Sequence, residues 1–310
     1  MTVTVAIATY KRAWALQYSL ASLTNQSVPP DEVLIILKAA PHDNSMDVIS
    51  GFEGRLPIRV VMQGDGNMAD AVNMAIQNAR GDLLLFLDDD AVAEDKWIEK
   101  YMQMFRQHDD MGALSGPVYD AYIENNVLVK TEEFNRSIPT ASTFYRRPLP
   151  EFQDYCEWVS VSGFMGAKQC DTRLMRATGF RGANMGFRVE SVRDCPLSSL
   201  YRGSRVCFQN EQILAFCVRR SGFHVYRSLD PSIAPMVWHI HHGASLTTSR
   251  GFRRLAWTHY DRVMTFWRLR KLGAQVSFTA YAAAMLVAMR REPLQRLLGT
   301  IYGLIHGVFL

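Results

Sequence analysis

Four short apolar runs alternate with helical patterns over the first 90 residues of the chain. Residues 2–8, 32–37, 58–62 and 83–87 are rich in Val, Ile and Leu and predict strands, and the uninterrupted apolar run at 83–87 is typical of a strand buried on both faces. Between them, residues 14–23 and 68–79 have the apolar spacing of helices, and residues 47–52 predict a short one. Strands alternating with helices predict an α/β fold with a mostly parallel central sheet and right-handed crossovers.

The pattern changes twice after this region. Helices are predicted at 94–107 and 210–221, and strands at 111–117, 223–227 and 236–242, whereas residues 118–170 give mixed strands and long loops. We therefore divide the chain into residues 1–117, residues 118–245, and a helical extension at 246–310.

Three consecutive carboxylates, Asp88, Asp89 and Asp90, directly follow the fourth strand. Ligands of open α/β sheets bind at the carboxyl ends of the strands. Adjacent acids repel one another unless a cation compensates them, and Mg²⁺ or Mn²⁺ binds carboxylate and phosphate oxygens. A solvated acidic turn is the plain alternative, but the buried strand before the acids favours a site for a divalent cation and a phosphate. The chain lacks a G-x-G-x-x-G turn and a Walker lysine loop, which argues against dinucleotide or P-loop chemistry.

Composition describes a globular protein, with 48% hydrophobic and 21% charged residues. The net charge of +4 is unevenly distributed, because the part from Leu246 onward has ten Lys and Arg against two acids, or +8, which leaves −4 for the first 245 residues. A basic extension on a slightly acidic body indicates an anionic partner, either membrane lipid or nucleic acid.

The five cysteines are odd in number and form no C-x-x-C pair. This pattern favours reduced thiols in a cytoplasmic setting over a disulfide framework or a zinc site. Residues 2–8 enter a strand without a basic segment or cleavage site before them, so we expect no secretory signal.

Several motifs together resemble the family 2 glycosyltransferases, which have a GT-A fold. Their ordered set covers residues 3–243, and it consists of V-A-I-A-T-Y-K-R, A-V-N ending at Asn73, A-R-G-D-L-L-L-F-L-D-D-D, G-A-N-M-G-F-R, N-E-Q-I-L and W-H-I-H-H. The resemblance implies transfer of a sugar from a nucleotide diphosphate donor to a hydroxyl acceptor, with inversion at the anomeric carbon. A divalent cation, Mn²⁺ or Mg²⁺, would stabilise the leaving diphosphate.

The resemblance also assigns roles to the donor and metal residues. Asp88 would face the ribose and the metal, Asp89 would contribute to the donor site, and Asp90 would ligate the metal. His239 would complete the metal site, with His242 as a competing ligand. The remaining donor contacts would come from Thr9, Tyr10 and Arg12 beside the nucleobase and ribose, and from Asn73.

Inversion in one displacement needs one general base, and the matching position is Glu211. Its alternative role is that of an acid favoured by the dipole at a helix N-terminus. Asn184 and Arg188, in the glycine-rich segment, would line the donor sugar and the acceptor.

The turn after the second strand departs from the family pattern. Relatives usually have an acid-rich turn that reads the base, whereas this chain has K-A-A-P-H-D, so Asp43 is only a displaced candidate. The Q-x-x-R-W motif of processive synthases is absent, which favours addition of a single sugar. The alternatives are a catalytically decayed scaffold and a nucleotidyltransferase, although the chain lacks the glycine-rich, lysine-bearing loop of the latter.

The helical extension interleaves cations with aromatic residues at 250–271, and two apolar stretches follow at 276–289 and 297–310. Each stretch is about 14 residues, too short for the roughly 20 that cross a bilayer. We expect a peripheral protein on the cytoplasmic, inner face of a membrane, bound to its anionic surface. The alternatives are packing on the catalytic domain or a homodimer. No nucleic-acid-binding fold signature accompanies the basic residues, so we expect no nucleic acid partner.

Overall fold

The computed structural model describes residues 1–125, 127–134, 140, 142–169, 173–241, 251–288 and 293–308. The elements of its first part are β1 (Val3–Thr9), α1 (Ala13–Thr24), β2 (Glu32–Lys38), α2 (Ser45–Ser50), β3 (Ile58–Gln63), α3 (Met68–Asn78), β4 (Leu83–Leu87), β5 (Ala91–Ala93), α4 (Trp97–Gln107), β6 (Met111–Ser115), β7 (Val118–Glu124) and β8 (Val127–Phe134). Those of its second part are η1 (Phe144–Arg146), η2 (Pro150–Phe152), β9 (Glu157–Val159), β10 (Met165–Ala167), β11 (Met175–Arg176), β12 (Asn184–Arg188), α5 (Val189–Val192), α6 (Leu197–Leu200), α7 (Asn210–Arg220), β13 (His224–Arg227), β14 (Val237–Ile240), α8 (Phe252–Lys271), α9 (Phe278–Ala288) and α10 (Pro293–Val308).

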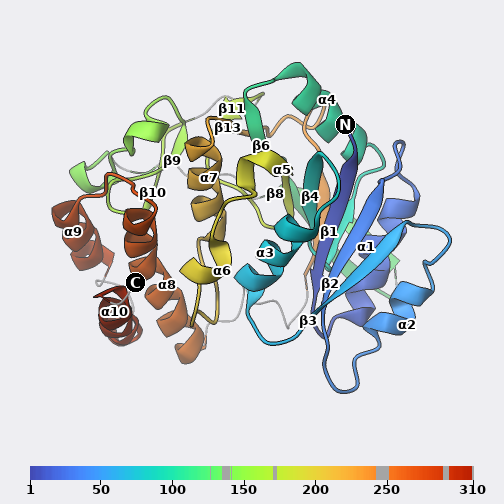
Figure 1. The fold of residues 1–310 in the computed structure, drawn as a ribbon, viewed down its shortest axis with the longest axis horizontal. Helices are drawn as coiled ribbons and strands as arrows, with labels where there is room; N and C mark the ends of the chain where they lie inside the picture. Colours follow the sequence, from blue (N-terminus) through green and yellow to red (C-terminus); the bar gives the residue numbers. More distant parts are fainter. Residues whose placement is uncertain are drawn as a thin grey trace.

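A central sheet of eight described strands runs through the molecule in the order β11-β13-β6-β12-β4-β1-β2-β3 (Figure 1). Strands β1 to β4 are parallel to one another, and β13 is parallel to β6, whereas β12 runs antiparallel between β4 and β6. The strands predicted from the first 90 residues are thus confirmed. The segments 1–117 and 118–245 share this one sheet.

Side chains alternate between the two faces of the sheet and form two apolar cores. In β4, Leu84 and Phe86 face the core that includes α3 and α7, while Leu83, Leu85 and Leu87 face the core that includes α1 and α4. All five are buried. Burial on both faces explains why β4 is a continuous apolar run in the sequence.

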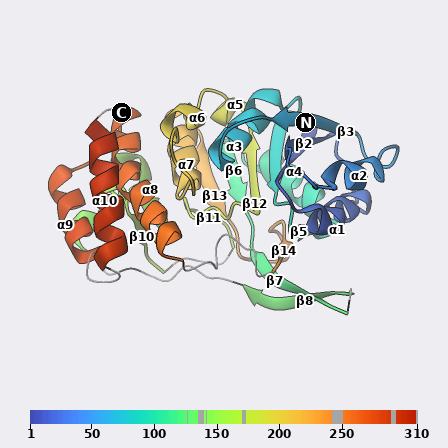
Figure 2. The same ribbon diagram turned by 90° about the horizontal axis from the view of Figure 1, so that it is seen from below.

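A second described sheet has the order β5-β14-β7-β8. Its β7–β8 hairpin projects from the body of the molecule (Figure 2). Gly116, at the crossing to this sheet, lies against the chain before β14, because a Cβ there would be 1.7 Å from the carbonyl oxygen of Pro235. Only glycine allows this approach of the two segments.

The helices α8, α9 and α10 form one group at the end of the molecule farthest from β3 (Figure 2). Helix α8 packs against α6: Arg268, fully buried, pairs with Asp261 of the same helix at 2.8 Å and donates to the carbonyl oxygen of Leu200 in α6. Arg268 therefore has a structural role and is not available to an anionic surface. No helix among the described residues has the length and the apolar composition needed to cross a membrane.

The expectation of reduced thiols is wrong. A disulfide joins Cys195, after α5, to Cys217 in α7, and Cys156 is disulfide-bonded as well. Helices α5 and α7 pack together, and the Cα atoms of the first pair are 5.7 Å apart, a distance that a disulfide requires and that spacing along the chain does not reveal. Cys207 is a buried free thiol.

Candidate functional site

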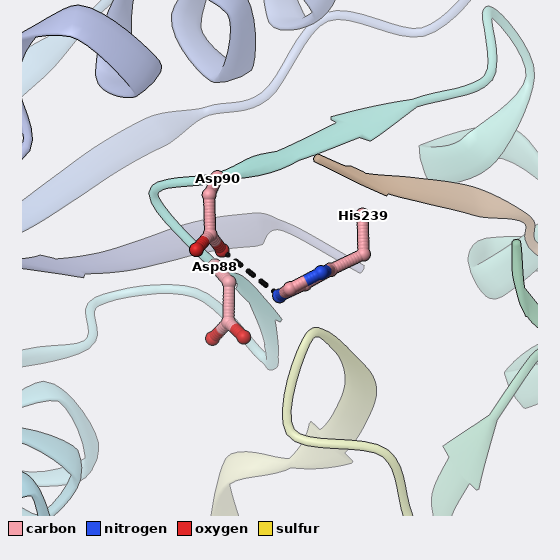
Figure 3. A group of neighbouring side chains, drawn as sticks. All are labelled: Asp88, Asp90 and His239. Carbon is pink, nitrogen blue, oxygen red and sulfur yellow. Dashed lines mark ion pairs between the residues drawn. The ribbon is translucent and has the colours of Figure 1, made fainter. Parts of the chain in front are cut away.

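Asp88, Asp90 and His239 converge at the carboxyl end of β4. One ligand atom from each lies within 4.8 Å of the others, and the Nε2 atom of His239 is 3.2 Å from Oδ1 of Asp90 (Figure 3). Asp90 is 1% exposed, and Asp88 and His239 are half-buried. His239 lies 149 positions after Asp90 in the sequence, so the cluster combines distant parts of the chain.

Strand pairing brings His239 to this position. The chain leaves β4 at Asp88, turns, and enters the short strand β5, which pairs antiparallel with β14 so that His239 lies opposite Ala91. The next residue of β14, Ile240, donates its backbone N–H to the carbonyl oxygen of Asp90 at 2.7 Å. The second sheet thus fixes the imidazole beside the carboxylates.

Arg12 is the cation that faces the acidic turn. Its Nη1 atom lies 2.9 Å from Oδ1 of Asp89 and 2.6 Å from Oδ2 of Asp90. The resemblance placed Arg12 beside the nucleobase and ribose, whereas in the structure it forms ion pairs with these two carboxylates. The charges of the two aspartates outweigh burial and raise the pKa of Arg12, so it stays charged.

Burial has the largest effect on the pKa values of Asp88 and Asp89. It raises the pKa of Asp88 to about 6, and the Asp90 charge adds to this effect while His239 and Arg12 oppose it. Burial likewise raises the pKa of Asp89 to about 7 against the opposing charge of Arg12. The pKa of His239 is raised because its hydrogen bond with Asp90 outweighs burial.

This donor set fits a divalent cation. Two carboxylates and an imidazole are ligands that Mn²⁺ accepts, and Mg²⁺ binds to one or two carboxylates together with substrate oxygens. One arginine faces three carboxylates here, so a bound cation would relieve repulsion that remains after Arg12 has paired.

Glu211 lies in the first turn of α7. A Cβ on Gly182 would be 3.4 Å from its Oε1 atom, so the glycine-rich segment passes directly beside this carboxylate. Burial raises the pKa of Glu211 to about 7, with a further contribution from the charge of Asp88 and an opposing one from Arg181. The base candidate and the acidic cluster therefore interact electrostatically.

A cavity of about 910 Å³ opens beside the cluster. Thr9, Tyr10 and Arg12 line it, as the resemblance implies, and Asp89 connects it to the acidic turn. Tyr10 is 48% exposed, and the ammonium groups of Lys11 and Lys38 lie 5.2 and 5.7 Å from the centre of its ring. The cavity thus offers an aromatic face together with cations, features that suit a base and a diphosphate.

Asp43 and Asn73 do not line this cavity. The carboxylate of Asp43 accepts hydrogen bonds from Ser45 and from the backbone of Lys11, so it shapes its own loop. Asn73 is half-buried within α3. His242 lies outside the described residues.

The roles expected of Asn184 and Arg188 are not supported. The fully buried Asn184 amide accepts from Trp97 and Tyr101 and donates to the carbonyl oxygens of two prolines, so its hydrogen-bonding capacity is used within the protein. Arg188 is paired with Leu83 in the antiparallel register, at the end of β4 opposite to Asp88. The sequence motif does not reveal that β12 runs antiparallel to β4, and this direction places Arg188 far from the carboxyl end of β4.

The wall of the cavity opposite β1 comes from residues that sequence reasoning missed. They lie in α6 and in the loop after it, and are Ser198, Ser199, Arg202, Gly203, Ser204, Arg205 and Val206. Asn67 caps α3 and donates from Nδ2 to the carbonyl oxygens of Tyr201 and Ser204, which ties this wall to the other one. The clustering of small residues and arginines at 198–206 was the only available signal.

The sequence matches the model of the family described as glycosyl transferase family 2 over residues 4–166. Curated relatives include a chondroitin synthase from Escherichia coli, 32% identical over 115 residues that make up 36% of this chain and 17% of that protein. Another is the validoxylamine A glucosyltransferase of Streptomyces hygroscopicus subsp. limoneus, 28% identical over 159 residues, 48% of this chain and 35% of that protein. The matched regions are thus a small part of these relatives' lengths.

Two solved structures share the fold. One is S. aureus TarS 1–349 in complex with UDP-GlcNAc, with a TM-score of 0.58 and 12% identity over 99% of this chain and 81% of that chain. The other is GalNAc-T7 with UDP, GalNAc and Mn²⁺, with a TM-score of 0.56 and 11% identity over 94% and 59% of the two chains. These likenesses, which concern the fold alone, confirm the predicted GT-A architecture.

Proposed function

Because this chain belongs to glycosyl transferase family 2, we propose that it transfers one sugar from a nucleotide diphosphate donor to a hydroxyl acceptor, with inversion at the anomeric carbon. The observation that carries the proposal is the convergence of Asp88, Asp90 and His239 next to a 910 Å³ cavity lined with cations. Retention of this cluster speaks against a decayed scaffold.

The donor would occupy the cavity. Its base would meet the exposed ring of Tyr10, and its diphosphate would be drawn to the cations of both walls, among them Lys11, Arg12 and Arg202. The structural neighbours named above were solved with UDP-GlcNAc and with UDP and GalNAc, which supports a nucleotide-sugar donor.

Asp88, Asp90 and His239 would hold a divalent cation, for which the neighbour solved with Mn²⁺ gives support. When bound, such a cation neutralises the charge that develops on the departing diphosphate. Arg12 keeps Asp89 and Asp90 oriented and partly neutralised.

Glu211 would be the general base. A carboxylate with a pKa of about 7 takes up a proton readily at neutral pH. The acceptor hydroxyl would give its proton to Glu211 as its oxygen attacks the anomeric carbon, and the bond to the diphosphate would break on the opposite face.

A panel of nucleotide sugars tests this function. We expect hydrolysis or transfer with at least one donor in the presence of Mn²⁺, and a loss of turnover by at least about 100-fold in an Asp90→Ala variant that still folds. Undiminished turnover in that variant would refute the metal role, and the absence of turnover with every donor would contradict the proposed transfer reaction.

A further inference from the structure

The helix α10 has two different faces. On one face, Gly299 and Gly303 press against α8, since a Cβ at either glycine would come within 2.6 Å of Ala256 or Val263 atoms. Closely approaching glycines spaced by four residues make an intimate helix–helix contact. The face of α10 that carries these two glycines therefore packs against α8.

The opposite face of α10 is exposed and apolar. Leu294 is 64% exposed and Ile305 is 55% exposed, and the residues between them continue the stripe with the spacing of a helix face. The exposed apolar side chains of α9 and α10 are Phe278, Leu286, Val287, Leu294, Leu297, Leu298, Ile301, Tyr302, Leu304 and Ile305. We call these residues the apolar face. An exposed group of this size indicates a binding surface.

The charges around the apolar face have one sign. Asp261 is the only acid among residues 251–288 and 293–308, and it is fully buried against Arg268. Exposed cations lie at both ends of α8, which packs on α10: Arg253 at its start, and Arg270 and Lys271 at its end. Among the described residues of these three helices, the exposed charges are all cations, which matches an anionic partner.

We propose that the apolar face docks on an anionic lipid bilayer, with α9 and α10 lying in the plane of the headgroups. Side chains such as Leu297 and Ile301 would enter the acyl boundary while the cations of α8 reach the headgroups. A second copy of the chain fits less well, because two such faces brought together would oppose like charges. This binding goes beyond the proposed transfer reaction and does not depend on it.

Vesicle sedimentation of the full chain tests the proposal. We expect binding to phosphatidylcholine vesicles that contain phosphatidylglycerol to exceed binding to pure phosphatidylcholine vesicles by at least about 10-fold, and to weaken in high salt. The triple variant Leu297→Gln, Ile301→Gln, Ile305→Gln should lose at least about 10-fold in affinity for the anionic vesicles. These positions are exposed, so the variant should keep its fold and its melting temperature.

The matched control is Met46→Gln with Met62→Gln, which changes exposed apolar residues of the sheet domain, and it should bind vesicles like the wild type. Equal binding of the triple variant and the wild type would overturn the proposal, as would equal binding to neutral and anionic vesicles. A wild-type dimer in light scattering that the triple variant dissociates, without vesicle binding, would assign the face to a second copy instead.

Discussion

Glu211 sits where a helix N-terminus favours a charged carboxylate, yet its pKa is raised to about 7. Burial and the charge of Asp88 outweigh the opposing effects of a backbone hydrogen bond and of the Arg181 charge. Its alternative interpretation as an ordinary first-turn acid therefore does not account for its surroundings.

Replacing Glu211 with Gln should lower kcat by about 1,000-fold, because the amide keeps the shape but accepts no proton. Donor binding, measured by calorimetry, should change little. The control is Glu190→Gln, which alters an exposed acid in the first turn of α5. A near-normal kcat in the Glu211 variant would remove this residue as the base.

The same substitution should affect stability in a pH-dependent manner. The folded-state pKa of about 7 lies above that of a free glutamate, so wild-type folding loses stability as the pH rises from about 4.5 to about 7, as Glu211 becomes charged. In metal-free buffer, Glu211→Gln should match the wild type at pH 5 and exceed it by about 2 kcal/mol at pH 8. Urea unfolding at both pH values checks this, and a variant that is less stable at pH 8 would contradict it.

Asn184 illustrates a residue that the motif placed in the site and the structure places in the core. Asn184→Ala would leave the indole of Trp97, the hydroxyl of Tyr101 and two carbonyl oxygens without their partner. We expect a loss of about 3 kcal/mol in the free energy of unfolding, with an unchanged donor KM in the remaining folded protein. A selective rise in KM without loss of stability would restore its role at the sugar.

At the scale of elements, α8 supports both the cavity wall and the turn before Glu211. The buried Asp261 accepts from Ser204 at 2.8 Å and from the backbone of Phe208 at 3.0 Å, and Thr265 donates to Gln209. Cys207 and Gln209 have φ angles of 55° and 64°, a left-handed region that costs energy in residues other than glycine. Helix α8 thus holds a strained turn between the cavity and the base.

Ser204→Ala should therefore raise the donor KM by about 10-fold, since it breaks a hydrogen bond with a charged group that fixes the cavity wall. The control Ser191→Ala removes a buried hydroxyl of α5, which donates to the carbonyl oxygens of Gly112 and of Arg188, the last residue of β12. Steady-state kinetics should show a normal donor KM in this control. Equal effects of the two substitutions on KM would show that Ser204 acts through general stability.

Periodicity predicted the elements of the first 90 residues because β1, β2 and β4 are almost wholly buried and carry a strong apolar signal. The strand β5 has three residues and is too short to give such a signal. The sequence therefore did not predict its pairing with β14, which places His239 beside the carboxylates. Contacts such as that of Arg12 with Asp90 depend on distances in space that the motifs do not encode.

At the scale of the whole molecule, two functional surfaces lie in different places. The cavity and the acidic cluster lie at the carboxyl ends of the central strands, and the apolar face belongs to α9 and α10 at the far end (Figure 2). The charge distribution along the sequence indicated this division, and Arg253, Arg270 and Lys271 of α8 are indeed exposed while Asp261 and Arg268 pair in the interior. The packing of α8 on the catalytic part links the two regions.

The central claim is that Asp88, Asp90 and His239 hold a divalent cation against a diphosphate. Calorimetric titration of Mn²⁺ into the protein with a nucleoside diphosphate tests it most directly. The wild type and the control Asp120→Asn, which alters the carboxylate 2.7 Å from His241, should bind Mn²⁺ equally. Asp90→Asn should bind it at least about 10-fold more weakly, whereas equal binding by wild type and Asp90→Asn would contradict the account.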